Sequence, residues 1–213
     1  MLVYVATHNA GKLRELQAIF APVGWTLAAY GGYRDVAEGD QSYAENAALK
    51  ARALFTQIAQ RDAANVLGDD SGLEVAALGG RPGIRSARYG GESSTWAQRR
   101  SQLLTELAPF TDAERSARFV CALHFVAREG IETAAAATYD GSIARRERGH
   151  AGFSYDSIFV GDDGRTFAEL SDIEKNHRSH RRLAADALLA ALDGRTRADV
   201  GVGVADGIRT RDL

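Results

Sequence analysis

Apolar residues in the first half of the chain group into short runs and helix-spaced stripes. Three short runs predict buried strands, at residues 2–6, 25–30 and 66–68. Three longer segments have apolar side chains at helical spacing and predict amphipathic helices, at residues 13–20, 43–59 and 96–107. Polar stretches between them predict a turn and a loop, at residues 7–12 and 31–41. Strands and helices therefore alternate here, as in α/β folds.

The periodicity changes in the second half. Two long segments predict a β-hairpin that turns at residues 128–130, namely residues 118–127 and 131–139. Shorter strand candidates follow at residues 141–148, 156–160 and 166–167. A dense polar run at residues 174–182 is also typical of a solvated loop, and a closing helix is expected over residues 180–192. The order predicts an α/β fold with a mixed sheet, flanking helices and two lobes around a central ligand-binding cleft.

Residues 193–213 differ from the rest, since they show no helical periodicity. We expect residues 1–192 to form the domain and residues 193–213 a poorly ordered tail. The codons ATT CGA ACC would encode Ile208-Arg209-Thr210, and they are the reverse complement of GGTTCGAAT, which is typical of the T-arm of a transfer RNA gene. Read-through into an antisense transfer RNA gene would explain this end, and so would an ordinary variable tail.

Composition and charge exclude several classes of function. The chain has 213 residues, 45% of them hydrophobic, and a formal net charge of −2, so it can bury a globular core but has no basic field for long nucleic acid. Its single cysteine, Cys121, lies in an apolar run and is expected to be a buried small hydrophobe. No segment has the apolar length of a membrane span, and no basic leader precedes the first strand. We therefore expect a cytoplasmic protein that binds anions in a local pocket.

An acidic run, Asp69-Asp70-Ser71-Gly72, follows the third predicted strand. Adjacent carboxylates repel each other, and such a pair usually persists because a positive group, often a metal ion, lies between them. Taken alone, the run is more typical of a capped turn with two solvated aspartates. Ligands of α/β sheets, however, usually bind beyond the carboxyl ends of strands.

Three other segments carry lysines that can reach such a site, at residues 7–12, 45–50 and 174–176. The first lies between a strand and a helix, where backbone N–H groups favour phosphate and Lys12 adds charge. Lys50 emerges from an alanine-rich helix face and can reach a cleft, although a solvated lysine is the alternative. Phe153, near Gly149 and Gly152, can stack on a base or pack in the core. Carboxylates for a divalent metal and lysines for phosphates together indicate a nucleoside triphosphate site.

Taken together, these segments resemble the inosine triphosphate pyrophosphatase family, also called the dITP/XTP pyrophosphatases. The matches occur in the family's order and cover about residues 2–192: Thr7-x-Asn9-x-x-Lys12, Ser42-Tyr43-x-Glu45-Asn46-Ala47-x-x-Lys50-Ala51, Asp69-Asp70-Ser71-Gly72-Leu73, Pro82-Gly83-Ile84-x-Ser86-Ala87-Arg88-Tyr89, Phe153-x-Tyr155-Asp156, Glu174-Lys175 and Ser179-His180-Arg181. The family cleaves a nucleoside triphosphate between its α- and β-phosphates, which releases a monophosphate and pyrophosphate. The resemblance implies ITP, dITP and XTP as substrates in a central nucleotide-binding cleft, Mg²⁺ as cofactor, and a homodimer.

The resemblance also implies a role for each matched residue. Asp70 would be the general base and a metal ligand, Lys50 would act beside it on the triphosphate, and Glu38 would be a further Mg²⁺ ligand. The residues expected at the triphosphate are Thr7, His8, Asn9, Ala10, Gly11, Lys12, Ser71 and Lys175. Those expected at the base are Phe153, Ser154, Tyr155, Asp156, His180 and Arg181.

Two positions depart from the family pattern, which usually has glycine at Ser154 and proline at Ser157. A serine in place of glycine is costly if the position needs a positive φ, so the departures concern the base loop. They leave open a related pyrophosphatase for other modified nucleotides. A non-catalytic nucleotide-binding module is a further alternative, but such a module would not need Asp70 as a proton acceptor.

Overall fold

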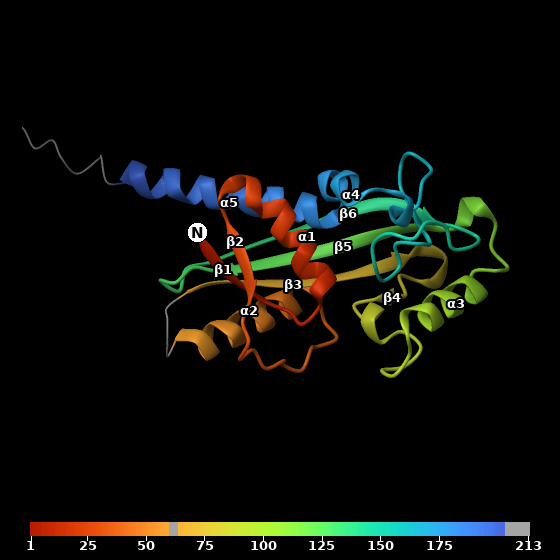
Figure 1. Ribbon diagram of the computed structural model, residues 1–213, viewed down its shortest axis with the longest axis horizontal. Coiled ribbons are helices and arrows are strands. Elements are labelled where there is room, and N and C mark those ends of the chain that lie inside the picture. Colours follow the sequence, from red (N-terminus) through yellow and green to blue (C-terminus); the bar gives the residue numbers. More distant parts are fainter. Residues whose placement is uncertain (60–63, 203–213) are drawn as a thin grey trace, which may run out of the picture.

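A mixed β-sheet runs the length of the molecule and carries helices on both faces (Figure 1). The computed structural model describes residues 1–59 and 64–202. The strands are β1 (Leu2–Ala6), β2 (Thr26–Ala29), β3 (Asn65–Val75), β4 (Pro82–Gly83), β5 (Ser116–Val126), β6 (Glu132–Ile143) and β7 (Phe159–Val160). The α-helices are α1 (Ala10–Phe20), α2 (Tyr43–Ala59), α3 (Trp96–Glu106), α4 (Asp172–Arg178) and α5 (His180–Val202). The predicted α/β class with a mixed sheet is confirmed.

β3 joins the parallel and antiparallel parts of the sheet. β1 pairs in parallel with both β2 and β3. β5 pairs antiparallel with β3 over residues 66–75 and then with β6, which confirms the predicted hairpin. The strand order is β2-β1-β3-β5-β6-β7, and β4 pairs with the far end of β3.

Two apolar cores lie on opposite faces of this sheet. α1 and α5 cover one face, where Leu16 and Leu188 share a cluster with Leu67 of β3 (Figure 1). α2 covers the other face, where Leu54 shares a cluster with Val66. Neighbouring residues of β3 enter different cores because side chains alternate along a strand. The same alternation governs the acidic residues that follow.

A third core occupies the other end of the molecule, around α3. It contains Leu73 of β3, Leu103 of α3 and Phe119 of β5, together with Tyr155 and Phe159. This core forms the second lobe, so β3 and β5 extend from one lobe into the other (Figure 1).

The predicted end of the third strand is wrong. The acidic run was expected in a turn after residue 68, but β3 continues to Val75 and holds Asp69 and Asp70 near its middle. The backbone pairs with β5 throughout, with Asp70 opposite Ala122. Polar side chains do not end this strand because its backbone stays paired and both carboxylates find cationic partners from the covering helices.

Three expectations for the C-terminal half also change. Within residues 156–160, Phe159–Val160 forms a strand and the preceding segment turns, while Thr166 makes an isolated bridge to Val160 before a 3-10 helix begins at Phe167. The polar run 174–182 forms the end of α4 and the start of α5, with Ser179 between the two helices. α5 continues past residue 192 to Val202, into the segment predicted to be a tail. Residues 203–213, including those of the transfer RNA hypothesis, lie outside the described residues.

Within the described part of the chain, no helix combines the length and apolar character that crossing a membrane requires.

Candidate active site

Two neighbouring carboxylates of β3 point to opposite faces of the sheet. Lys12 of α1 and Arg181 of α5 contact Asp69 on one face. Lys50 of α2 contacts Asp70 on the other. Strand alternation therefore separates two charges that the sequence places side by side.

Asp69 is buried and surrounded by donors. Its Oδ1 forms an ion pair with the Lys12 ammonium, and its Oδ2 lies 3.3 Å from Arg181 Nε and accepts from Cys121 Sγ at 3.4 Å. Burial alone would raise the pKa of Asp69, but Lys12 and Arg181 more than offset it and hold that pKa well below its usual range. Cys121 is buried as expected and has this additional role as a donor.

Asp70 has a weaker set of partners. Its Oδ1 lies 2.8 Å from Lys50 Nζ, and its Oδ2 accepts from Asn46 Nδ2 at 3.4 Å. The Lys50 ammonium is shared with Glu38, whose Oε1 lies 2.6 Å away. Burial raises the pKa of Asp70 above its usual value, and Lys50 opposes this only in part. A buried carboxylate with a raised pKa is suited to accept a proton.

The absence of a side chain at Gly68 lets α2 approach β3 closely. A Cβ at this position would lie 2.1 Å from the carbonyl oxygen of Ala47 and 3.0 Å from the Cβ of Ala51. Any larger residue would push α2 away from the strand. The contact between Lys50 and Asp70 therefore depends on Gly68 and the alanine face of α2.

Asn46 fixes the loop that carries Glu38. Its side-chain oxygen accepts from the Gly39 N–H at 2.8 Å, and its amide nitrogen donates to the Gly39 carbonyl at 3.2 Å. Glu38 is thereby held beside Lys50. Asn46 has no predicted role in the sequence, although it lies four residues before Lys50 and hence on the same helix face.

A second buried ion-pair cluster lies between α1, α4 and the loop that contains Phe153 and Asp156, here called the base loop. Lys175 Nζ lies 2.5 Å from Glu15 Oε1 and 2.5 Å from Asp156 Oδ2. Glu15 Oε2 also accepts from Arg181 Nη1 at 2.5 Å. Burial would raise the pKa of Glu15, but Arg181 and Lys175 lower it further than burial raises it. Glu15 is not among the predicted site residues, and its one signal in the sequence is a carboxylate directly before the apolar Leu16 of α1.

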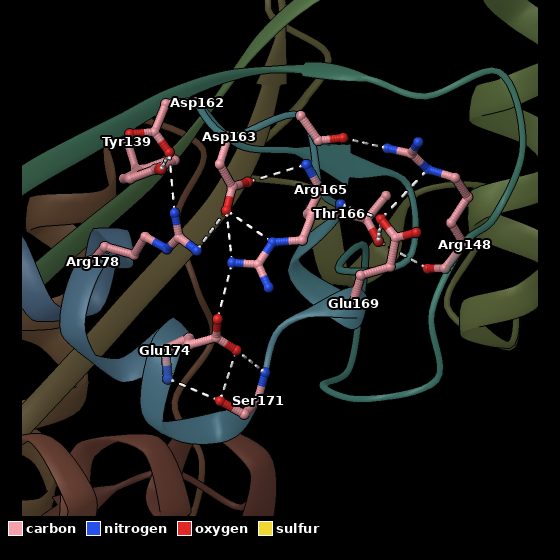
Figure 2. Close-up of polar contacts among 11 residues, drawn as sticks. Tyr139, Arg148, Asp162, Asp163, Arg165, Thr166, Glu169, Ser171, Glu174 and Arg178 are labelled. Carbon is pink, nitrogen blue, oxygen red and sulfur yellow. Dashed lines mark hydrogen bonds and ion pairs between the residues drawn. The ribbon is translucent and has the colours of Figure 1, made fainter.

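Ion pairs with the loop after β7 fix α4, the helix that carries Lys175 (Figure 2). Arg165 Nη2 lies 2.9 Å from Glu174 Oε1, and Arg178 Nη2 lies 2.8 Å from Asp163 Oδ2. These contacts hold both ends of the short helix, so the position of Lys175 is set by residues outside the cleft.

Phe153 lies among the cations of the site. The Lys175 ammonium is 4.8 Å from its ring centre and the Arg181 guanidinium is 5.5 Å away. Its N–H donates to Asp156 Oδ2 at 2.6 Å. A Cβ at Gly11 would lie 2.7 Å from Phe153 Cδ1, so the ring packs directly over the glycine.

His180 is buried in the wall of the cleft. It stacks on Phe119, with ring centres 4.6 Å apart and planes inclined by 16°. Among the described residues, its Nδ1 has no hydrogen-bond partner. Burial and the nearby Arg181 lower the pKa of His180 well below its usual value, so the imidazole is neutral. A neutral imidazole can donate one hydrogen bond and accept another.

Each guanidinium nitrogen of Arg181 contacts a protein group. Nε contacts Asp69, Nη1 contacts Glu15, and Nη2 donates to Ser71 Oγ at 2.8 Å. The residue is buried, and in this structure it joins the two carboxylate clusters. Its predicted contact with the base stays a prediction.

One cleft brings most of these residues together. Its polar end is lined by Asn9, Lys12, Glu38, Lys50, Asp70 and Ser71. Its apolar end is lined by Leu73, Ile84, Ala87, Trp96, Phe119, Phe153 and Tyr155, and the remaining lining residues are Gly72, Ser86, Ser154, Asp156, His180 and Arg181. Trp96 and Phe119 are not among the predicted site residues, because apolar residues of a cleft and of a core look alike in sequence.

The predicted residues of the N-terminal turn divide into two groups. Asn9 caps α1, since its Oδ1 accepts from Gly11 N at 2.9 Å and from Lys12 N at 3.1 Å. His8 stacks on Tyr33, with ring centres 5.2 Å apart, and does not line the cleft. Other predicted residues that are not part of the cleft lining are Thr7, Ala10, Gly11 and Lys175.

The carboxylates of Glu38 and Asp70 fit a divalent cation. Both contact one Lys50 ammonium, so positive charge already lies between them. The described residues contain no group of three or more His, Cys, Asp or Glu side chains arranged as a complete metal site. Mg²⁺ typically takes one or two carboxylates together with waters and substrate phosphates, so this pair is sufficient.

The fold and the cleft define an α/β protein with a polar site suited to a phosphorylated ligand. A model of the Ham1 family matches residues 3–191, so the chain belongs to the Ham1 family. It is 47% identical over 179 residues to the dITP/XTP pyrophosphatase of Geobacillus kaustophilus, which covers 82% of this chain and 85% of the relative.

Solved structures agree. The Staphylococcus aureus Ham1 protein matches with a TM-score of 0.76 and 35% identity over 92% of this chain and 100% of that one. A HAM1 protein from Coxiella burnetii matches with a TM-score of 0.78 and 34% identity over 91% and 99%. The predicted family resemblance is confirmed.

Proposed function

We propose that this chain hydrolyses dITP, ITP and XTP to the nucleoside monophosphate and pyrophosphate, and so removes deaminated purine nucleotides from the nucleotide pool. The observation that carries the proposal is a buried carboxylate of raised pKa, Asp70, in one cleft with Lys12 and Lys50. Membership of the Ham1 family and the similarity to dITP/XTP pyrophosphatases support the same reaction.

Asp70 acts as the proton acceptor in this proposal. Water is a poor nucleophile towards a polyanionic triphosphate, and a positioned carboxylate improves it by taking its proton. Lys12 and Lys50 bind the phosphates and stabilise the negative charge on the departing pyrophosphate. Lys50 contacts Asp70 and Glu38 in this structure, so its ammonium lies at the two carboxylates beside which the phosphates would bind.

Glu38 and Asp70 would hold Mg²⁺. The ion, when bound, neutralises part of the phosphate charge and lowers the pKa of a coordinated water. Asn46 supports this end of the site, since it contacts Asp70 and holds the loop of Glu38 at Gly39.

The base is recognised at the apolar end. Phe153 provides a face for stacking, and His180 provides a buried polar nitrogen that has no hydrogen-bond partner among the described residues. Hypoxanthine and xanthine carry a 6-oxo acceptor where adenine carries a 6-amino donor. A site built to donate a hydrogen bond there would reject adenine by up to roughly 10⁴–10⁵.

Pyrophosphate release from a panel of nucleotides tests the proposal. With Mg²⁺, the purified protein should turn over ITP, dITP and XTP far faster than ATP or GTP, and removal of the metal with a chelator should stop the reaction. Equal rates on all five nucleotides would remove the specificity. Binding of ITP without turnover would instead indicate a nucleotide-binding module.

A homodimer, which the family resemblance implies, and a cytoplasmic location, which rests on the sequence alone, remain predictions. Light scattering of the eluting protein during gel filtration would measure the mass in solution. A monomer across the working concentration range would exclude the dimer.

A further inference from the structure

The two positions that depart from the family pattern are joined to one arginine of α3. Arg100 Nη1 donates to the Ser154 carbonyl at 2.8 Å, and Arg100 Nε lies 3.0 Å from Glu147 Oε2. Ser157 Oγ donates to the same Glu147 oxygen at 2.9 Å. α3 therefore contacts the base loop directly at Ser154, and through Glu147 at Ser157.

Ser154 needs such support because of its backbone conformation. Its φ is 60°, and among the described residues it alone combines a positive φ with a side chain. The left-handed region is unfavourable for residues that carry a Cβ. A hydrogen bond to the Ser154 carbonyl orients the peptide that follows it and so favours this conformation.

The same segment sets the position of Phe153. On the inner side, Asp156 Oδ2 accepts from the Phe153 N–H at 2.6 Å, and the ring lies over Gly11. On the outer side, Arg100 holds the adjoining residue, Ser154. Arg100 does not line the cleft, so it acts on the ring only through the loop.

A second contact shows that α3 is the support of this loop. Trp96, one turn before Arg100, meets Tyr155 edge-on, with ring centres 5.4 Å apart. Tyr155 is buried, and its hydroxyl donates to the Ser86 carbonyl at 3.0 Å. The loop is thus fixed at three consecutive residues, of which Ser154 is held by a polar contact alone.

We propose that Arg100 is a positioning residue for the base: it holds Ser154 in the left-handed conformation and thereby keeps Phe153 over Gly11, where its ring can stack on the base. This inference rests on the proposed function. Loss of Arg100 should weaken binding of the base and leave the phosphate end unchanged, which raises KM and spares kcat.

The test compares variants by KM and kcat for dITP. Arg100→Ala should raise KM by roughly fivefold to tenfold, as expected for loss of one charge-assisted hydrogen bond, with kcat changed by less than about twofold. Inhibition by tripolyphosphate, which has no base, should be unchanged. Arg145→Ala is the matched control, because Arg145 is an exposed arginine paired with Asp112 at 2.7 Å. It should leave KM unaltered.

Rescue separates positioning from general stability. Ser154→Gly in the Arg100→Ala background should return KM towards the original value, because glycine adopts the left-handed conformation without strain. If Arg100→Ala does not fold, Arg100→Lys replaces it, because an ammonium cannot hold Ser154 and Glu147 as a planar fork does.

An unchanged KM in a folded Arg100 variant would overturn the inference. So would an equal loss of tripolyphosphate inhibition, or a failure of Ser154→Gly to restore KM. If the unmodified protein releases no pyrophosphate from any nucleotide, the proposed function fails on its own. The Kd for ITP, measured by calorimetry with the same variants, then tests the role of Arg100 separately.

Discussion

The two faces of β3 shift the pKa values of adjacent carboxylates in opposite directions. On the face covered by α1 and α5, Lys12 and Arg181 lower the pKa of Asp69 despite its burial. On the face covered by α2, burial outweighs Lys50 and raises the pKa of Asp70. One carboxylate therefore stays charged and anchors cations, while its neighbour has the higher proton affinity. Carboxylates whose pKa values are pushed apart by their surroundings commonly divide structural and acid–base roles.

The number of cationic partners explains why the pKa values of Asp69 and Asp70 differ. Both side chains are buried, so desolvation acts on both. Asp69 has two cations of its own, whereas Asp70 shares Lys50 with Glu38. The negative charge of Asp70 is therefore only partly neutralised, and Asp70 is the carboxylate that can bind a further cation.

The largest expected effect is on turnover. Asp70→Asn should lower kcat for dITP by on the order of 10²–10⁴, because an amide cannot accept the proton of water. Its free energy of unfolding should stay the same or rise, because the amide avoids burial of a charge. Pyrophosphate release and urea denaturation of one preparation measure both, and substantial residual turnover would contradict the base role.

The corresponding change on the other face should act on stability. Asp69→Asn should reduce the free energy of unfolding by about 3–5 kcal/mol, because it leaves Lys12 and Arg181 without their buried carboxylate. Urea denaturation without metal is the measurement. Equal destabilisation by Asp69→Asn and Asp70→Asn would break the comparison between the two faces.

The pH dependence of stability should distinguish Asp69 from Asp70 more finely. The folded pKa of Asp69 lies below its unfolded value of about 3.9, so its stabilising effect is present above that pH and is lost as pH falls through the folded pKa. The folded pKa of Asp70 is raised, so its charged form opposes folding at neutral pH and this effect disappears on protonation. The stability lost in Asp69→Asn should therefore be constant from pH 7 to about 5 and should shrink below about 4. A difference that grows on acidification would have the wrong sign.

The smallest expected effect concerns Cys121. Cys121→Ala removes one donor to Asp69 but leaves Lys12 and Arg181 in place, so the free energy of unfolding should fall by about 1–2 kcal/mol with turnover retained. Thermal and urea denaturation check this. A loss as large as that of Asp69→Asn would mean that the thiol, and not the cations, holds Asp69.

The sequence predicts the framework of this site better than its details. Periodicity located α1, α2, α3 and the β5–β6 hairpin, because the apolar side chains of these elements pack into the cores on the two faces of the sheet. It failed at Asp69 and Asp70, where polar residues continue a strand whose partner, β5, lies far along the chain. It could not find Glu15, because a lone carboxylate on a helix identifies neither Lys175 nor Arg181 as its partners.

Family motifs placed Lys12, Lys50 and Asp70, and these residues do line one cleft. They could not show that Lys175 and Arg181 are held by buried carboxylates in this structure, because ion pairs between α1, α4 and α5 depend on tertiary packing.

The proposed reaction is tested most directly by identifying which phosphoanhydride bond of dITP breaks. Phosphorus NMR of dITP incubated with the protein and Mg²⁺ distinguishes the possible products. If Asp70 is the proton acceptor of the proposed hydrolysis, the products are dIMP and pyrophosphate. The signals of both products should be lost with Asp70→Asn. Formation of dIDP and orthophosphate, or intact dITP with a folded protein, would contradict the proposed reaction.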